Sequence, residues 1–287
     1  MPWSETYDLD LDEVYRAVSA RKAKRVLLQF PDGLRDYAPR IAALVEERTG
    51  AEAIVSGEPC YGACDTPSAS QMAAAGAELL VQFGHSPMPS VPVRDTLFVR
   101  AKYRMPIRPV IAKAVAQLGL QGKRVGFVTT AQYQHKLDEA IAALRDLGVE
   151  ALVGKGDLRI ALAAQVLGCN YTAALAVEPD VAAFFYLGSG DFHPLGLALE
   201  TPKDVIVADP ETGDVRLMSG LRDRILRQRF AAIQTAKDRG GKRFAVLVST
   251  KPGQFRLRLA EQLKKRIEAK GGEAVIVQVD TLSPDNL

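Results

Sequence analysis

The stretch Lys24-Arg25-Val26-Leu27-Leu28-Gln29-Phe30 decides the fold, because a version of it occurs three times in the chain. A basic pair followed by an apolar run recurs at residues 123–129 and 242–248. Each copy is followed by turn-forming residues and then by apolar residues three and four positions apart, which is typical of one face of a helix. Self-similarity of this kind indicates repeated supersecondary units.

The order of elements after each helix is also repeated. A glycine followed closely by a glutamate leads into a second short strand at Gly50, Gly148 and Gly272, and glycine suits the left-handed cap that ends a helix. The first two units continue with further apolar runs at 77–83, 96–100, 181–187 and 204–208. Short apolar strands that alternate with helices predict parallel sheets covered on both faces.

We therefore expect an α/β fold of three repeated parallel-sheet α/β domains around a pseudo-threefold centre, the third incomplete. The expected domains span residues 1–103, 104–213 and 214–287. The alternative is one large doubly wound sheet whose halves resemble each other by chance. The repeated entry motif favours three units.

Composition excludes several classes of protein. The 287 residues are 47% hydrophobic and 25% charged, as in an ordinary globular protein, and the net charge of +3 is too small to indicate a nucleic-acid partner. The acidic N-terminus is unlike a secretory signal, and no apolar run is long enough for a membrane helix. We expect a cytoplasmic protein, in which three cysteines indicate a metal or catalysis more than disulfides.

The residues that could carry chemistry follow the predicted strands, where open parallel sheets bind their ligands. In the first unit they are Asp32, Gly33, Cys60, Cys64 and His85. In the second unit they are Cys169, Gly188, Ser189, Gly190 and His193.

Each of these motifs also has a structural interpretation. A single cysteine is more often a small buried hydrophobic residue than a ligand, and the Cys60–Cys64 spacing indicates zinc only weakly without a second pair. The Gly188–Gly190 run could be a tight turn or a backbone nest for an anionic group. His135 lies in a polar helical segment, and we interpret it as structural.

The equivalent placement of cysteine in two repeated units favours a shared metal centre. Three thiolates on a 4Fe–4S cluster leave one iron open, which is what an enzyme that cleaves S-adenosylmethionine needs. The closely spaced three-cysteine motif of radical enzymes is absent from the sequence, so the ligands would come from separate domains.

Six motifs give the chain a family resemblance: 25–33, 61–65, 83–86, 165–170, 188–196 and 249–254. Together they resemble the archaeal-type enzymes that make 2-(3-amino-3-carboxypropyl)histidine, the first step of diphthamide synthesis. The Tyr-Gly-Ala-Cys and Phe-His-Pro-Leu-Gly elements weigh most.

The resemblance implies a homodimer of three-domain protomers, each with a 4Fe–4S cluster held by one cysteine per domain. Cys64 and Cys169 match two of these ligands, and Cys60 falls outside the family's cysteine position. The third ligand has no counterpart and is expected beyond Leu287. The resemblance also implies that Asp32, Gly33, His85 and the 188–196 loop with His193 line the substrate pocket.

The implied reaction is reductive cleavage of the sulfonium–Cγ bond of S-adenosylmethionine. The 3-amino-3-carboxypropyl group is then transferred to a histidine of translation elongation factor 2. Two alternatives remain: a non-catalytic partner subunit of the same pathway, and a quinolinate synthase-like iron–sulfur enzyme. The Phe-His-Pro-Leu-Gly element argues against the second alternative.

Overall fold

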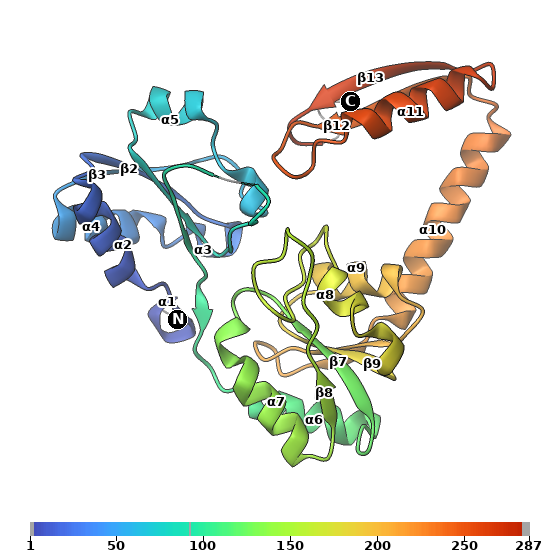
Figure 1. Cartoon of the computed structure of the whole chain (residues 1–287), viewed down its shortest axis with the longest axis horizontal. Helices are drawn as coiled ribbons and strands as arrows, with labels where there is room; N and C mark the ends of the chain where they lie inside the picture. The colour runs from blue at the N-terminus through green and yellow to red at the C-terminus, as the bar shows by residue number, and fades with distance from the viewer. Residues whose placement is uncertain (1–2, 92, 283–287) are drawn as a thin grey trace. The chain divides into compact units, whose positions relative to one another are not determined.

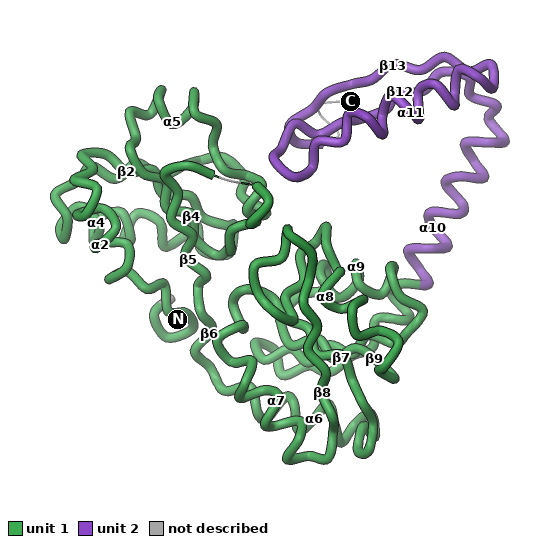
Figure 2. The backbone as a smooth tube through the Cα atoms, in the orientation of Figure 1, with its two compact units in different colours: residues 1–222 green, residues 223–287 purple. Residues whose placement is uncertain are grey.

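The computed structural model describes residues 3–91 and 93–282, and the chain forms two compact units, Met1–Arg222 and Asp223–Leu287 (Figure 2). The first unit contains a four-stranded and a five-stranded sheet, and the second contains a two-stranded sheet (Figure 1). The expected domain boundaries stay predictions, and the expected end of the third domain at 283–287 lies outside the described residues.

The four-stranded sheet is entirely parallel, with the order β3-β2-β4-β5. Its strands are β2 (Arg25–Gln29), β3 (Glu52–Val55), β4 (Leu79–Phe83) and β5 (Thr96–Val99). The helices of this region are α2 (Leu11–Arg21), α3 (Asp32–Arg35), α4 (Ala38–Thr49), the 3₁₀ turn η1 (Ala63–Asp65) and α5 (Ala69–Ala75). Ile41 and Val45, one helical turn apart, are buried from α4 in the same core as Val26 and Leu28 of β2.

The five-stranded sheet has the order β11-β10-β9-β7-β8, and only its edge strand β11 is antiparallel. Its strands are β7 (Arg124–Thr129), β8 (Glu150–Leu152), β9 (Ala183–Leu187), β10 (Val205–Ala208) and β11 (Val215–Leu217). Its helices are α6 (Arg108–Leu118), η2 (Gln134–Lys136), α7 (Leu137–Asp146), α8 (Thr172–Leu175), η3 (Glu178–Asp180) and α9 (Phe192–Glu200).

Strand β9 shows why this sheet is apolar on both faces. Phe185 belongs to the core cluster that contains α6 and α7, whereas Phe184 and Tyr186 belong to the cluster that contains α8 and α9. Successive side chains of a strand point to opposite faces, so helices cover both sides of the sheet. The expected α/β fold with parallel sheets is therefore confirmed.

A short antiparallel pair joins the two sheets of the first unit. Strand β1 (Tyr7–Asp8), which follows α1 (Trp3–Thr6), pairs with β6 (Lys102–Tyr103). The tyrosine hydroxyls there reach the turn after β10: Tyr103 donates to the carbonyl of Pro210 at 2.9 Å, and Tyr7 donates to the Glu211 carboxylate at 2.7 Å. Nothing in the local sequence pattern predicted this pair.

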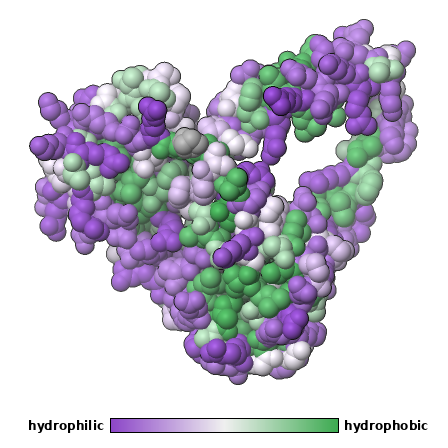
Figure 3. Space-filling model, viewed as in Figure 1, coloured by the Kyte–Doolittle hydropathy of each residue, from purple (hydrophilic) through white to green (hydrophobic). Residues whose placement is uncertain are grey.

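The second compact unit contains part of α10 (Ser219–Asp238), and then β12 (Arg243–Ser249), α11 (Leu257–Glu268) and β13 (Glu273–Val279). Its two strands are parallel, as the strand–helix–strand pattern predicted. Hydrophobic residues lie on the visible surface of this unit (Figure 3), and those with exposed side chains include Phe244, Leu247, Leu259, Leu263 and Val275. The pseudo-threefold arrangement of three units stays a prediction.

Within the part of the chain that the structure describes, every helix is too short or too polar to cross a membrane.

Replacing Phe83 by alanine tests the core beneath the carboxyl ends of β2 and β4. The Phe83 ring is fully buried and stacks on Phe30 with centroids 4.5 Å apart. We expect Phe83→Ala to lower the free energy of unfolding by about 3–5 kcal/mol, because truncation leaves a cavity. Urea denaturation followed by circular dichroism measures this loss.

Leu158→Ala is the matched control, because the Leu158 side chain is 81% exposed. It should change the free energy of unfolding by no more than about 0.5 kcal/mol. Equal effects of the two substitutions would contradict the described core.

Candidate functional site

The loop that carries Cys64 is held by the carboxylate of Asp65. Asp65 Oδ2 accepts the backbone N–H groups of Tyr61 at 2.7 Å and of Gly62 at 2.8 Å. These hydrogen bonds within residues 61–65 close the loop that contains η1, and the Cys64 side chain is partly exposed. A thiol with access to solvent can bind a metal, whereas a buried thiol in an apolar site is inert.

Two buried glutamines of the four-stranded sheet support this loop through hydrogen bonds. Gln29 and Gln82 lie opposite each other on β2 and β4, and the amide of Gln82 donates to Gln29 Oε1 at 2.8 Å. Gln29 donates in turn to the Asp65 carbonyl at 2.7 Å. Sequence reasoning missed this pair, although the apolar runs 24–30 and 77–83 both end in Gln-Phe, and that repeated glutamine was a usable signal.

Cys60 differs from Cys64 in its surroundings. Its side chain is only 2% exposed, and its Sγ lies 3.8 Å from Nδ1 of His85. Burial lowers the pKa of His85 to about 4, although the Asp65 carboxylate opposes that shift. His85 is therefore neutral near pH 7.

Asp32 and Gly33 lie at the surface in α3, directly after β2. Asp32 forms an ion pair with Arg35 at 3.1 Å, and Arg35 also donates to the carbonyl of Glu58 at 3.2 Å. A Cβ added to Gly33 would meet open space. The two residues are thus connected to the segment before Cys60.

The Cys169 loop is packed against the start of α9. Tyr171 donates its hydroxyl to the Gly168 carbonyl at 3.1 Å, and a Cβ at Gly196 would lie 1.7 Å from that hydroxyl. A Cβ at Gly168 would lie 2.1 Å from the Phe192 ring. Both glycines therefore allow a close approach that any side chain would block. The Cys169 side chain itself is exposed.

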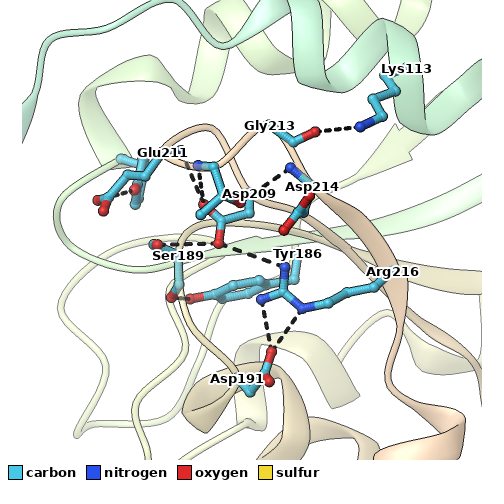
Figure 4. Close-up of polar contacts among 11 residues, drawn as sticks. Lys113, Tyr186, Ser189, Asp191, Asp209, Glu211, Gly213, Asp214 and Arg216 are labelled. Atoms are coloured by element: carbon cyan, nitrogen blue, oxygen red, sulfur yellow. Dashed lines mark hydrogen bonds and ion pairs between the residues drawn. The ribbon is translucent and has the colours of Figure 1, made fainter.

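The Gly188–Gly190 turn follows β9, as predicted, but the segment 188–196 is not one loop. Residues Phe192–Glu200 form helix α9, which places His193 in its first turn. The motif contains Pro194 and three glycines, which are unfavourable inside a helix, but proline is tolerated in the first turn of a helix. For this reason the helix that starts at Phe192 was not predicted. The turn is anchored by Ser189, whose hydroxyl donates to the buried carboxylate of Asp209 at 3.2 Å (Figure 4).

His193 and His85 lie close enough to influence each other. Burial lowers the pKa of His193 to about 4, and the charge of His85 contributes to that shift. The two histidines come from different sheets of the first unit. The structure therefore brings together two of the predicted site residues that are 108 positions apart in the sequence numbering.

Direct hydrogen bonds also join the two sheets beside these histidines. The Gln165 amide donates to the hydroxyl of Ser86 at 2.5 Å, and both side chains are buried. Gln132 donates to the Gly84 carbonyl at 3.0 Å. The segment after β4 is thus fixed against the loops of the second sheet, close to His85.

Within residues 3–91 and 93–282, no three His, Cys, Asp or Glu side chains come together as a ready metal site. The roles of Cys64 and Cys169 as ligands of one cluster stay a prediction. What the geometry provides is two accessible thiols on strand-end loops and two neutral imidazoles between the sheets.

Comparison with known proteins shows which family this chain resembles. A family model described as "Putative diphthamide synthesis protein" matches residues 30–287. The 2-(3-amino-3-carboxypropyl)histidine synthase of Pyrococcus horikoshii is 35% identical over 277 residues, which cover 96% of this chain and 78% of that protein. Subunit 1 of the synthase from Caenorhabditis elegans is 28% identical, over 98% of this chain and 70% of its own length.

Solved structures agree with the sequence comparison. The crystal structure of Dph2 from Pyrococcus horikoshii matches 98% of this chain and 80% of its own chain with a TM-score of 0.87 and 35% identity. The crystal structure of Dph2 with a 4Fe–4S cluster matches with the same TM-score of 0.87, over 98% of this chain and 81% of that one. The chain therefore belongs to the diphthamide synthesis protein family.

Proposed function

We propose that this chain is a 2-(3-amino-3-carboxypropyl)histidine synthase, which transfers the 3-amino-3-carboxypropyl group of S-adenosylmethionine to a histidine of translation elongation factor 2. The observation that carries the proposal is the pair of accessible cysteines on strand-end loops, in a chain 35% identical to a synthase whose structure with a 4Fe–4S cluster is known. We further propose a cytoplasmic homodimer of three-domain protomers, with domains at 1–103, 104–213 and 214–287.

The donor set fits a cluster in part. Cys64 and Cys169 offer thiols that solvent can reach, which are the usual ligands of iron in such clusters. Cys60 is buried against His85, so it is poorly placed to act as a third ligand.

A bound 4Fe–4S cluster would supply the electron that cleaves the sulfonium–Cγ bond. The residues of this chain orient the substrate and exclude water. His85 and His193 place neutral imidazole nitrogens between the two sheets, where each can accept a hydrogen bond near pH 7. We propose that they and the Gly188–Gly190 turn line the substrate pocket, with Asp32 and Gly33 at its margin.

A non-catalytic partner subunit is the second candidate. A chain in which Cys64 and Cys169 match two cluster ligands of the family would suit this role. An iron-binding chain that never modifies the elongation factor alone, but stimulates a second family member, would establish this role.

The first test is the reaction itself. The protein is reconstituted with iron and sulfide without oxygen and mixed with dithionite, S-adenosylmethionine and archaeal elongation factor 2. We expect the elongation factor to gain the mass of one 3-amino-3-carboxypropyl group, because one imidazole carbon is the acceptor. Intact-mass spectrometry measures the gain.

An elongation factor in which the target histidine is replaced by glutamine is the control, and it should gain nothing. No transfer to the unaltered factor, despite full cluster loading, would contradict the proposed activity.

The second test separates the three cysteines. We expect Cys64→Ser and Cys169→Ser each to reduce iron retained after gel filtration by about 10-fold or more, because each removes one thiolate ligand. Cys60→Ser should retain nearly all of its iron, since the Cys60 thiol is buried beside His85. Iron and acid-labile sulfide are assayed per chain.

Cys60→Ser is also the matched control, because it changes the same atom four positions away. Iron loss in Cys60→Ser equal to that in Cys64→Ser would show that the ligand assignment is wrong.

The third test concerns the charge of the two imidazoles. The pKa values of His85 and His193 are lowered from 6.5 to about 4, mainly by burial. The unfolded chain therefore binds more protons than the folded one between about pH 6.5 and pH 4, so both residues make folding less favourable as the pH falls through that range. Imidazole NMR titration should give midpoints near 4 for both rings.

In the variant His85→Gln the pKa of His193 should rise, because the repulsion by a charged His85 is gone. A His193 midpoint that stays unchanged in this variant would contradict the proximity of the two rings.

A further inference from the structure

The turn after β9 is held by a carboxylate that the sequence patterns did not single out. Asp209 follows β10, and it is only 2% exposed. Its Oδ1 accepts the backbone N–H of Glu211 at 3.0 Å, and its Oδ2 accepts the hydroxyl of Ser189 at 3.2 Å. Figure 4 shows these bonds converging on one side chain.

Arg216 of β11 joins this carboxylate to a second one. Its Nη1 lies 3.7 Å from Asp209 Oδ2, and its Nε and Nη2 each lie 2.8 Å from Asp191 Oδ1 (Figure 4). Asp191 is the residue immediately before α9, yet its side chain makes no capping bond to that helix. The contact with Arg216 instead ties the residue before α9 to the edge strand β11.

Further bonds restrain the turn from its other side. The Gly188 N–H donates to the Ala208 carbonyl at 3.2 Å, and the Tyr186 hydroxyl donates to the Ser189 carbonyl at 3.5 Å. A Cβ at Gly188 would lie 2.7 Å from that hydroxyl, so the close contact requires glycine. The segment from Gly188 to Asp191 is thus fixed at both ends before His193 follows in α9.

We infer that Asp209 and Arg216 are positioning residues, which set the Gly188–Gly190 backbone and the His193 ring at the geometry needed for group transfer. This inference rests on the proposed function. It also assigns Ser189 a different task from contact with the substrate through its side chain, because its hydroxyl already donates to Asp209. Neither Asp209 nor Arg216 is placed against the reacting atoms.

The physical reason is the cost of burying a charge. A buried carboxylate is stable only when hydrogen bonds and an opposite charge compensate for its lost hydration. Asp209 meets that condition only while Ser189, the backbone of Glu211 and Arg216 keep their present places. Displacement of the turn would leave the charge undercompensated, so the network resists such movement.

The test compares Asp209→Asn, Ser189→Ala, Arg216→Gln and Arg216→Lys in the reconstituted protein. Hydrogen exchange by mass spectrometry reports on residues 188–196, and steady-state kinetics give kcat and the KM for S-adenosylmethionine. We expect about 10-fold faster exchange in that segment, with little change in β9, and a fall in kcat/KM of about 10- to 100-fold. Compared with Arg216→Gln, Arg216→Lys should recover part of the slow exchange and part of kcat/KM, because lysine keeps the positive charge but lacks the forked guanidinium group.

The matched control is Arg124→Gln. Arg124 forms a comparable pair with Glu150 at 2.9 Å, in the same sheet but at the amino ends of β7 and β8. This variant should leave exchange in 188–196 and kcat/KM unchanged. The double variant of Ser189→Ala and Asp209→Asn should lose no more kcat/KM than Asp209→Asn alone, because each change removes the same hydrogen bond between Ser189 and Asp209.

Exchange in 188–196 that is unchanged in Asp209→Asn and in Ser189→Ala would overturn the inference, as would an equal kinetic loss in Arg124→Gln. Should Asp209→Asn fail to fold, Ser189→Ala alone decides, since it removes only a hydroxyl. The exchange measurement does not depend on group transfer. An unaltered chain that transfers nothing would therefore refute the proposed function, while the exchange data still decide whether Asp209 and Arg216 hold the turn.

Discussion

The burial of the parallel strands on both faces is the constraint on which the rest of this structure depends. Phe185 faces one helical layer and Phe184 faces the other, so the central strand β9 is buried along its whole length. Chemistry is thereby confined to the segments that follow the strands. Those segments are held in place by hydrogen bonds with buried polar side chains, such as Gln29, Gln82 and Asp209.

Sequence patterns were sufficient for the parallel core and for the position of each cysteine loop, because apolar runs and helical spacing are local signals. They could not reveal the β1–β6 pair, which joins Tyr7 to Tyr103, nor the bond between Ser189 and Asp209. Contacts between such distant positions leave no periodic trace. The edge strand β11 was missed for a related reason, since three residues are too few to show alternation.

The candidate site was predicted unevenly. His85 and His193 were named from separate motifs, and the fold brings them together between the two sheets. Asp32 and Gly33 were named on equal grounds but lie on the surface in α3, because the chain turns into a helix directly after β2. Sequence position after a strand locates a residue at the right edge of a sheet, but it does not fix the direction of its side chain.

Glu211 gives the turn after β10 a second duty. Its Oε1 accepts the hydroxyls of both Tyr7 and Tyr133, while Asp209, two residues earlier, binds Ser189. One short turn therefore holds strand β1 through Glu211 and the Gly188–Gly190 turn through Asp209. The turn that contains Asp209 and Glu211 is therefore constrained by contacts on two sides. Amino-acid exchanges at Tyr7 and at Ser189 should be coupled across homologues, despite the distance between them in the chain.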